Sequence, residues 1–270
     1  MATPETTIGS TRRTEGLIRL AGVSKAFGDR LVMAGLDLTI GEGEFVCVVG
    51  PSGGGKSTLL NMISGLDEAT TGVVSFRGRA VSGLNNEVGY ITQRDLLLPW
   101  RTAANNIRLP LELRGWSRTA MAERVREILA MTGLDHAADS YPYELSGGMR
   151  KRVSIGRVLA YSPSVLLMDE PFASLDAQLR LQMHEELLRM WQDSRVTSVV
   201  FVTHDLVEAI TLADRVVVIA GQPGRVDLEL PIEIDRPRRV VDVQSHPRYA
   251  DYFQRLWSAL GHDQPTGGAQ

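Results

Sequence analysis

Four short apolar runs divide the chain: FVCVV (45–49), VLLM (165–168), VVFV (199–202) and VVVIA (216–220). Polar and apolar residues do not alternate within these runs, as they would in a strand with one solvent-exposed face. Continuous apolarity is typical of strands in a parallel sheet that is covered on both faces. The sequence therefore predicts four buried strands.

Helical patterns lie between these runs, at about 59–66 and 179–190. Apolar side chains recur there at the spacing of one helix face. Strands that alternate with helices predict an α/β core. The apolar positions are Leu59, Ile63 and Leu66 in the first pattern and Leu179, Met183, Leu187 and Met190 in the second.

The middle of the chain, about 94–160, lacks a comparable apolar run and predicts a mostly helical insert. One helix is expected over 118–131, with Ser117 as its N-cap and Gly133 as its stop. Its apolar face would consist of Met121, Val125, Ile128 and Leu129.

Composition changes this picture little. The 270 residues are 43% hydrophobic and 23% charged with a net charge of −3, as in an ordinary soluble protein, so charge gives no case for a nucleic-acid partner. The single cysteine, Cys47, lies in an apolar run, which predicts a buried thiol and excludes an internal disulfide framework. No signal peptide is visible, and no run approaches the roughly 20 apolar residues that span a bilayer. Residues 1–16 and 261–270 are expected to be loose tails.

The stretch GPSGGGKST follows the first apolar run and precedes a helical pattern. It matches the phosphate-binding pattern G-x-x-x-x-G-K-[ST] in the strand–loop–helix context that the pattern needs. Glycines let backbone N–H groups converge on a triphosphate, and the helix N-terminus adds partial positive charge. Lys56 can reach the β- and γ-phosphates, and Ser57 can ligate Mg²⁺. The predicted ATP-binding loop is Gly50, Pro51, Ser52, Gly53, Gly54, Gly55, Lys56, Ser57 and Thr58.

Three more polar side chains follow buried strands. Asp169 and Glu170 end the run VLLMDEP, and adjacent residues of a strand point in different directions, so one can organise Mg²⁺ while the other polarises an attacking water. His204, in VVFVTHD, could contact a γ-phosphate or orient that water. The other histidines, His184 included, are interpreted as loop residues with no metal-ligand spacing.

A second glycine turn, LSGGM (Leu145, Ser146, Gly147, Gly148 and Met149), opens a basic helix and is also suited to binding a phosphate. Gln93 and Phe27 are weak candidates by themselves. A glutamine is usually a surface residue, and an aromatic ring is usually core but can stack on a base.

Taken in order, Gly50–Thr58, Gln93, LSGGM, LLMDEP, SLD (174–176) and TH (203–204) resemble the motifs of the ATP-binding subunit of an ABC transporter. The resemblance covers about residues 17–225. It implies a P-loop NTPase (RecA-like) α/β core at 17–93 and 161–224, and a helical subdomain at 94–160. It further implies a small antiparallel β part near the N-terminus and a C-terminal extension at 225–260.

The resemblance also explains the two phosphate loops. In that family two cassettes pack head to tail. Within the signature loop Leu145–Met149 of one copy, Ser146, Gly147 and Gly148 would therefore bind the γ-phosphate held by Lys56 of the other. Phe27 would stack on adenine, where tyrosine is commoner, and Met149 stands where glutamine is commoner. The remaining implied roles are Mg²⁺ binding by Ser57, Gln93 and Asp169, general base catalysis by Glu170, sensing of water by Gln93, and γ-phosphate contact by His204. Asp176, in the D-loop Ser174, Leu175 and Asp176, would couple the two sites across the dimer.

A narrower resemblance is to the nitrate/sulfonate/taurine importer ATPases, carried by LLLPWRTAANNI, LSGGMRKR, DEPFASLDAQLR and GQPGRV, with Ala173 and Ser174 as mild departures. It implies a homodimer on the cytoplasmic face of the inner membrane, with permease subunits and an extracytoplasmic binding protein. LLLPW could form a groove for a permease helix or begin the helical insert; both could hold. Another ABC system (an exporter or a lipid-trafficking ATPase) and a soluble ABC-type ATPase acting on DNA or ribosomes are the alternatives.

Overall fold

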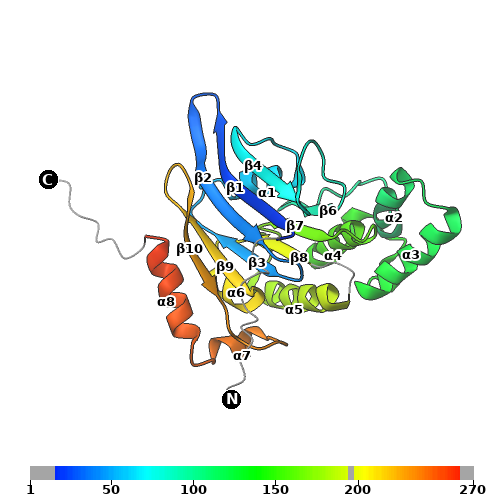
Figure 1. Ribbon diagram of the computed structural model, residues 1–270. Coiled ribbons are helices and arrows are strands. Elements are labelled where there is room, and N and C mark those ends of the chain that lie inside the picture. The colour runs from blue at the N-terminus through cyan, green and yellow to red at the C-terminus, as the bar shows by residue number, and fades with distance from the viewer. Residues whose placement is uncertain (1–15, 194–197, 262–270) are drawn as a thin grey trace, which may run out of the picture.

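The computed structural model describes residues 16–193 and 198–261. The predicted tails therefore lie outside the described residues, except for Gly16 and Gly261. The chain forms two sheets with helices packed around them (Figure 1). The helices are α1 (Lys56–Ser64), α2 (Ala103–Leu113), α3 (Arg118–Met131), α4 (Gly147–Leu159), α5 (Ala177–Asp193), α6 (Leu206–Leu212), α7 (Val240–Gln244) and α8 (Tyr249–Ala259).

The larger sheet has six strands in the order β10-β9-β3-β8-β7-β6. All neighbours in it are parallel except β10, which pairs antiparallel with β9. The four predicted strands are confirmed within one residue. The sequence missed β6, whose four residues include a glycine, and the edge strand β10. The strands are β3 (Phe45–Val49), β6 (Val88–Ile91), β7 (Val165–Asp169), β8 (Ser198–Val202), β9 (Arg215–Ala220) and β10 (Arg225–Pro231).

The smaller sheet confirms the antiparallel part expected near the N-terminus. Its order is β2-β1-β4-β5, and it lies beside α1 at the upper edge of Figure 1. Its strands are β1 (Ile18–Phe27), β2 (Arg30–Ile40), β4 (Thr71–Phe76) and β5 (Arg79–Ala80).

Two hydrophobic cores cover the two faces of the large sheet. Along β3, Val46 and Val48 face the core shared with α1 and the antiparallel sheet. Phe45, Cys47 and Val49 face the core shared with α4, α5 and α6. Successive side chains of a strand point to opposite faces, so a strand between two cores must be apolar throughout. The buried thiol of Cys47 is confirmed.

The helices α2, α3 and α4 fill the chain between β6 and β7 and project to the right of Figure 1. Helix α3 has the expected bounds, and the Ser117 hydroxyl accepts the Ala120 N–H at its start. The first helical pattern was wrong at one position. Helix α1 ends at Ser64, because Gly65 takes a left-handed conformation with φ +73°. A Cβ at this position would overlap the Gly83 carbonyl, so only glycine fits. Leu66 therefore lies beyond the helix and is 57% exposed.

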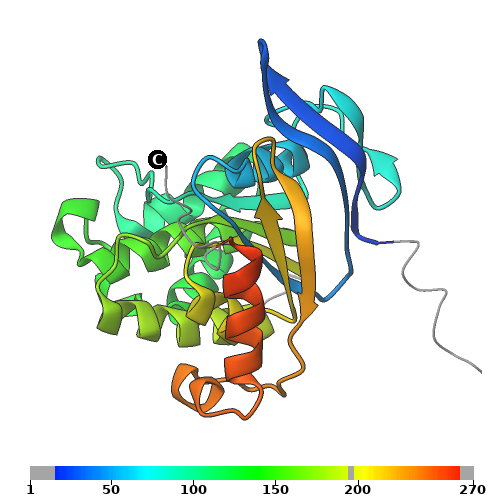
Figure 2. The same cartoon turned by 90° about the vertical axis from the view of Figure 1, so that its left-hand side faces the viewer.

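The C-terminal segment packs back on the core. Strand β10 adds to the edge of the large sheet, and α8 runs beside it and beside α6 (Figure 2). Tyr252 and Leu256 of α8 are buried, and the Tyr252 hydroxyl accepts the Glu233 N–H at 3.0 Å. No helix in the described part of the chain is long and apolar enough to cross a bilayer.

Candidate functional site

Four neighbouring parallel strands, β3, β8, β7 and β6, carry at their carboxyl ends the phosphate-binding loop, Gln93, Asp169, Glu170 and His204. Parallel strands bring their carboxyl ends to one edge of a sheet, which is where ligands bind in such folds. The strand ends are tied together beyond the ladders: Glu170 N donates to Val202 O at 3.0 Å, and Thr203 N donates to Val48 O at 3.1 Å. The loops after β3, β7 and β8 therefore start from a common edge.

The phosphate-binding loop requires glycine at its two ends. A Cβ on Gly50 would lie 2.2 Å from the carbonyl oxygen of Ile219, and Gly55 has φ +88°. Lys56 is buried, and its Nζ donates to the carbonyls of Gly50 and Pro51 at 2.9 Å each. Burial lowers the pKa of the Lys56 ammonium, and the charges of Glu170 and Asp169 oppose that shift. In the rest of the loop Ser52, Gly53 and Ser57 are exposed, Gly54 is buried and Thr58 is half-buried.

Asp169 is half-buried at the end of β7, near the Ser57 hydroxyl. Burial raises the pKa of its carboxyl, with Ser57 and Lys56 opposing the shift and Glu170 adding to it. The described residues contain no group of three His, Cys, Asp or Glu that could hold a metal alone. A hydroxyl and a carboxylate are the oxygen ligands from which Mg²⁺ sites with nucleotide phosphates are built, so the donor set fits this ion.

Glu170 and His204 face each other across the sheet edge. The His204 Nδ1 lies 3.3 Å from the Glu170 Oε2, with the imidazole mostly exposed and the carboxylate largely covered. Glu170 is also one of few non-glycine residues with positive φ, at +44°. Such a backbone conformation costs free energy and is concentrated at functional sites. The pair can share the handling of one water or phosphate oxygen.

Gln93 follows β6 and is exposed, and its loop is held by basic residues of α4 that the sequence did not single out. Lys151, whose side chain is 1% exposed, lies 2.7 Å from Asp95 Oδ1 and donates to the Gln93 carbonyl at 3.0 Å. Arg157 donates to the carbonyls of Asp95 and Leu96. The sequence shows that α4 is basic, but it does not show that these basic side chains bind the loop that carries Gln93.

The second phosphate loop begins α4. The Ser146 hydroxyl caps the helix by accepting the Met149 N–H at 3.3 Å, and Leu145 is buried. A Cβ on Gly148 would lie 2.7 Å from a methyl of Leu179 on α5, so the turn packs closely on that helix. No hydrogen bond among the described residues joins this loop to Gly50–Thr58.

The remaining candidates lie around the site. Phe27 ends β1 with an exposed ring, and Lys25 Nζ lies 4.7 Å from the ring centroid. In the SLD segment Ser174 is exposed, Leu175 is buried, and Asp176 caps α5 by accepting the Leu179 N–H. The interpretation of His184 as a loop residue is wrong: it lies inside α5, buried against Glu208 of α6.

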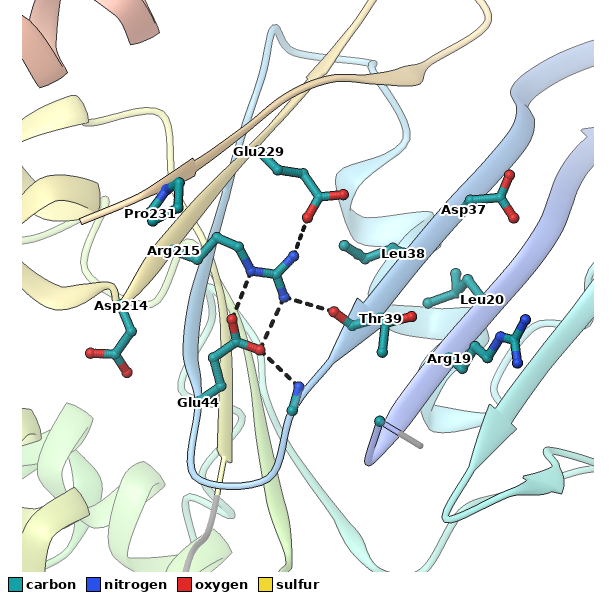
Figure 3. A pocket seen from close by; sticks show the side chains of 12 residues that line it. Arg19, Leu20, Asp37, Leu38, Thr39, Glu44, Asp214, Arg215, Glu229 and Pro231 are labelled. Atoms are coloured by element: carbon teal, nitrogen blue, oxygen red, sulfur yellow. Dashed lines mark hydrogen bonds and ion pairs between the residues drawn. The ribbon is translucent and has the colours of Figure 1, made fainter. Parts of the chain in front are cut away.

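A cavity of about 780 Å³ lies elsewhere, between β2 and the β9–β10 edge (Figure 3). Arg215 fills its polar wall, where the guanidinium pairs with Glu44 and Glu229 and donates to the Thr39 carbonyl at 2.7 Å. These contacts pin the antiparallel sheet to the core. The cavity shares none of the predicted site residues.

Residues 33–173 match the ABC transporter family. The chain belongs to the ABC transporter family. It is an ATP-binding subunit of that family and an ATPase.

Two relatives and one solved structure narrow the comparison. The nitrate import ATP-binding protein NrtD of Synechocystis is 40% identical over 238 residues, covering 86% of this chain and 89% of NrtD. The aliphatic sulfonates import ATP-binding protein SsuB 1 of Paraburkholderia xenovorans is 41% identical over 227 residues, covering 84% of this chain and 64% of SsuB 1. A dimeric ATP-binding cassette in a post-hydrolysis state, bound to ADP and Pi, is 32% identical with a TM-score of 0.68, covering 81% of this chain and all of that one. The P-loop NTPase fold of this ABC ATPase is thereby confirmed.

Proposed function

We propose that this ABC ATPase energises the import of a small anion such as nitrate, taurine or an aliphatic sulfonate. It would work as a homodimer on the cytoplasmic face of the inner membrane, with permease subunits and an extracytoplasmic binding protein. The similarity to a nitrate importer ATPase over most of both chains carries the assignment to import. The similarity to a sulfonate importer ATPase supports the anion class.

An apolar groove supports the permease partner. A hollow of about 250 Å³ lies between α2 and α3, lined by apolar atoms of Ala104, Val125 and Leu129 among others. Trp100, 71% exposed, stands shortly before α2, and Leu96 is also exposed. An apolar groove between two helices, with exposed apolar side chains in the segment that precedes one of them, suits an amphipathic helix of a partner protein.

The site residues would divide the hydrolysis of ATP among them. Phe27 would stack on adenine, while Gly50–Thr58 would hold the phosphates through backbone N–H groups and the Lys56 ammonium. Mg²⁺, held by Ser57, Asp169 and Gln93, would neutralise charge on the β- and γ-phosphates. Glu170 would accept a proton from the attacking water. His204, whose Nδ1 lies 3.3 Å from the Glu170 carboxylate, would contact the γ-phosphate.

Leu145–Met149 of a second copy would complete each site, with Ser174, Leu175 and Asp176 at the interface. A glycine turn at the start of α4 offers backbone N–H groups and the positive end of a helix to an anion. ATP would then join the two copies, and its hydrolysis would release them. The dimeric cassette similar to this chain supports that arrangement.

Mixing two inactive variants tests the composite site. Lys56→Ala and Ser146→Arg each damage one half of the site, so a mixed dimer keeps one intact pair of halves. An equal mixture would recover about a quarter of the wild-type sites, because half of the dimers are mixed and each holds one intact site of two. Absence of any recovery, with mixed dimers detected by mass, would overturn the head-to-tail site.

A gentle pull-down from native membranes tests the partners. We expect a multi-span permease and an anion-binding extracytoplasmic protein among the companions identified by mass spectrometry. Trp100→Asp should lose the permease, whereas Trp257→Asp, on α8, should retain it. Ribosomal or DNA-bound companions without a permease would refute transport, and a lipid exporter would refute import.

A further inference from the structure

Two polar contacts join α5 to the turn that carries His204. In the first, Arg180 Nη1 lies 3.4 Å from Asp205 Oδ2. The same guanidinium donates through Nη2 to the Leu175 carbonyl at 3.0 Å. One side chain therefore touches both the 174–176 loop and the residue that follows His204.

The second contact lies one helical turn further along α5. His184 Nε2 is 2.8 Å from Glu208 Oε1, and the Thr203 hydroxyl donates to the other carboxylate oxygen of Glu208. The Thr203 hydroxyl in turn accepts the Asp205 N–H at 3.0 Å. All three side chains of this contact are buried, from 2% to 6% exposed. The residue before His204 is thus fixed from within the core.

The two contacts lie side by side between the same two helices, α5 and α6. Arg180 and His184 are four residues apart on α5, and Asp205 and Glu208 are three apart at the start of α6, so each pair shares a helix face. The helices lie next to each other in Figure 1. We call the Arg180–Asp205 and His184–Glu208 contacts the two-rung bridge.

The donors and acceptors of the buried rung assign its protons. An ionised Glu208 only accepts, and with it Nε2 of His184 and the Thr203 hydroxyl are both donors. His184 Nδ1 is buried and has no hydrogen-bond partner among the described residues, which suits a bare lone pair, since a second proton there would find no acceptor among them. Thr203 keeps a lone pair for the Asp205 N–H. Each of these groups can act only as a donor or only as an acceptor in its contact with Glu208, so His184, Thr203 and Glu208 are held in one arrangement.

We propose that the two-rung bridge couples the two nucleotide sites of the dimer through the interior of each chain. The inference rests on the proposed roles of Asp176, at the interface with the partner copy, and of His204, at this copy's own nucleotide. A change at the 174–176 loop moves Arg180 and α5, and the bridge passes that movement to the turn at 203–205. Arg180, His184, Thr203 and Glu208 are positioning residues, since each acts through its contact with another side chain or carbonyl.

The test is the dependence of ATPase rate on ATP concentration in the full chain. His184→Leu removes the donor and keeps an apolar volume; it should lower kcat about 10-fold by displacing His204. The Hill coefficient, which in a coupled dimer lies between about 1 and 2, should fall toward 1. His184→Gln places an amide N–H near the position of Nε2 and should restore both values. A purely structural role would not change the Hill coefficient.

Thr211→Val is the matched control. Thr211 lies on α6 three residues after Glu208 and is 1% exposed, and its hydroxyl has no hydrogen-bond partner in the part of the chain that the structure describes. Valine has the same shape, so kcat and cooperativity should stay at wild-type values. A loss as large as that of His184→Leu would show that any change in this core is harmful, and would overturn the proposal.

Two further variants separate the possible failures. If His184→Leu does not fold, Arg180→Lys keeps the charge but cannot reach both Asp205 and the Leu175 carbonyl, so it should reduce the Hill coefficient in the same way. Wild-type cooperativity in both Arg180→Lys and His184→Leu, or in the one that folds, overturns the bridge. If Lys56→Ala meanwhile abolishes hydrolysis, the proposed site stands and only the bridge fails. If Lys56→Ala remains active, the proposed site itself fails.

Discussion

Lys151→Met tests whether the Gln93 loop is held by a buried ion pair. The variant keeps the apolar stem and removes the ammonium that lies 2.7 Å from Asp95 and 3.0 Å from the Gln93 carbonyl. Leaving one member of a buried pair without its partner costs about 3 to 5 kcal/mol. The Asp95 side chain is 25% exposed, and Arg150 Nε is 3.9 Å away, so water and this second cation relieve part of the loss. We expect a destabilisation of about 2 to 3 kcal/mol.

Thermal unfolding is the assay. For a chain of this size that loss lowers Tm by about 4 to 10 °C. The control is Arg108→Met, which breaks a 3.9 Å pair with Glu112 in which both side chains are about a third exposed. An exposed pair of this kind contributes about 0.5 kcal/mol, so Tm should fall by no more than about 2 °C.

The double variant Lys151→Met/Asp95→Asn decides the cause. Removing both charges leaves no orphaned carboxylate, so it should recover most of the Tm lost by Lys151→Met alone. The reasoning is refuted if Lys151→Met melts within about 1 °C of wild type. It is also refuted if the double variant is as unstable as the single one, since the loss would then come from packing.

Three further predictions concern Glu170 and Gly50 of the site and Cys47 of the buried strand β3. Glu170→Gln should keep ATP binding by equilibrium dialysis while turnover falls about 100-fold or more, and near-normal turnover would remove Glu170 as the base. Gly50→Ala should abolish ATP binding because its Cβ would meet the Ile219 carbonyl at 2.2 Å, whereas Gly53→Ala, with φ +79° and open space around it, should fold and lose only about 1 kcal/mol. Burial raises the pKa of the Cys47 thiol well above its usual range, so a disulfide reagent at pH 8 should modify it only at the rate of unfolding; modification of the native protein within minutes would contradict the packing of β3.

The strand-end loops could be predicted because each is a local signal. A continuous apolar run followed by glycines, by two carboxylates or by Thr-His marks the end of a buried strand within a few residues of sequence. Parallel pairing then brings those ends together without any knowledge of the intervening chain. The short strand β6 gave no such signal, since only VGYI pairs with β7.

The groups that hold the loops could not be predicted, because their partners lie far away in the sequence. Lys151 belongs to a run of basic residues that would suit a solvated helix face, yet it is buried against residues 93 and 95. His184 is one polar residue in an amphipathic helix, and its partner Glu208 lies on another. A pattern along one helix reveals which face is apolar, but not which polar side chain on that face has a buried partner.

Three loops of the proposed site are therefore held by contacts with neighbouring helices. Lys151 ties the Gln93 loop to α4, whose N-terminus carries Ser146, while the bridge ties the 174–176 loop and His204 to α5 and α6. Within the described residues, the Lys56 ammonium donates to the carbonyls of its own loop. A displacement of α2, α3 and α4, such as a permease in the groove between α2 and α3 would impose, would thus act on Gln93 and Ser146 together. Because Ser146 and Gln93 would then serve different nucleotides, one movement of the helical segment would act on both sites of the dimer.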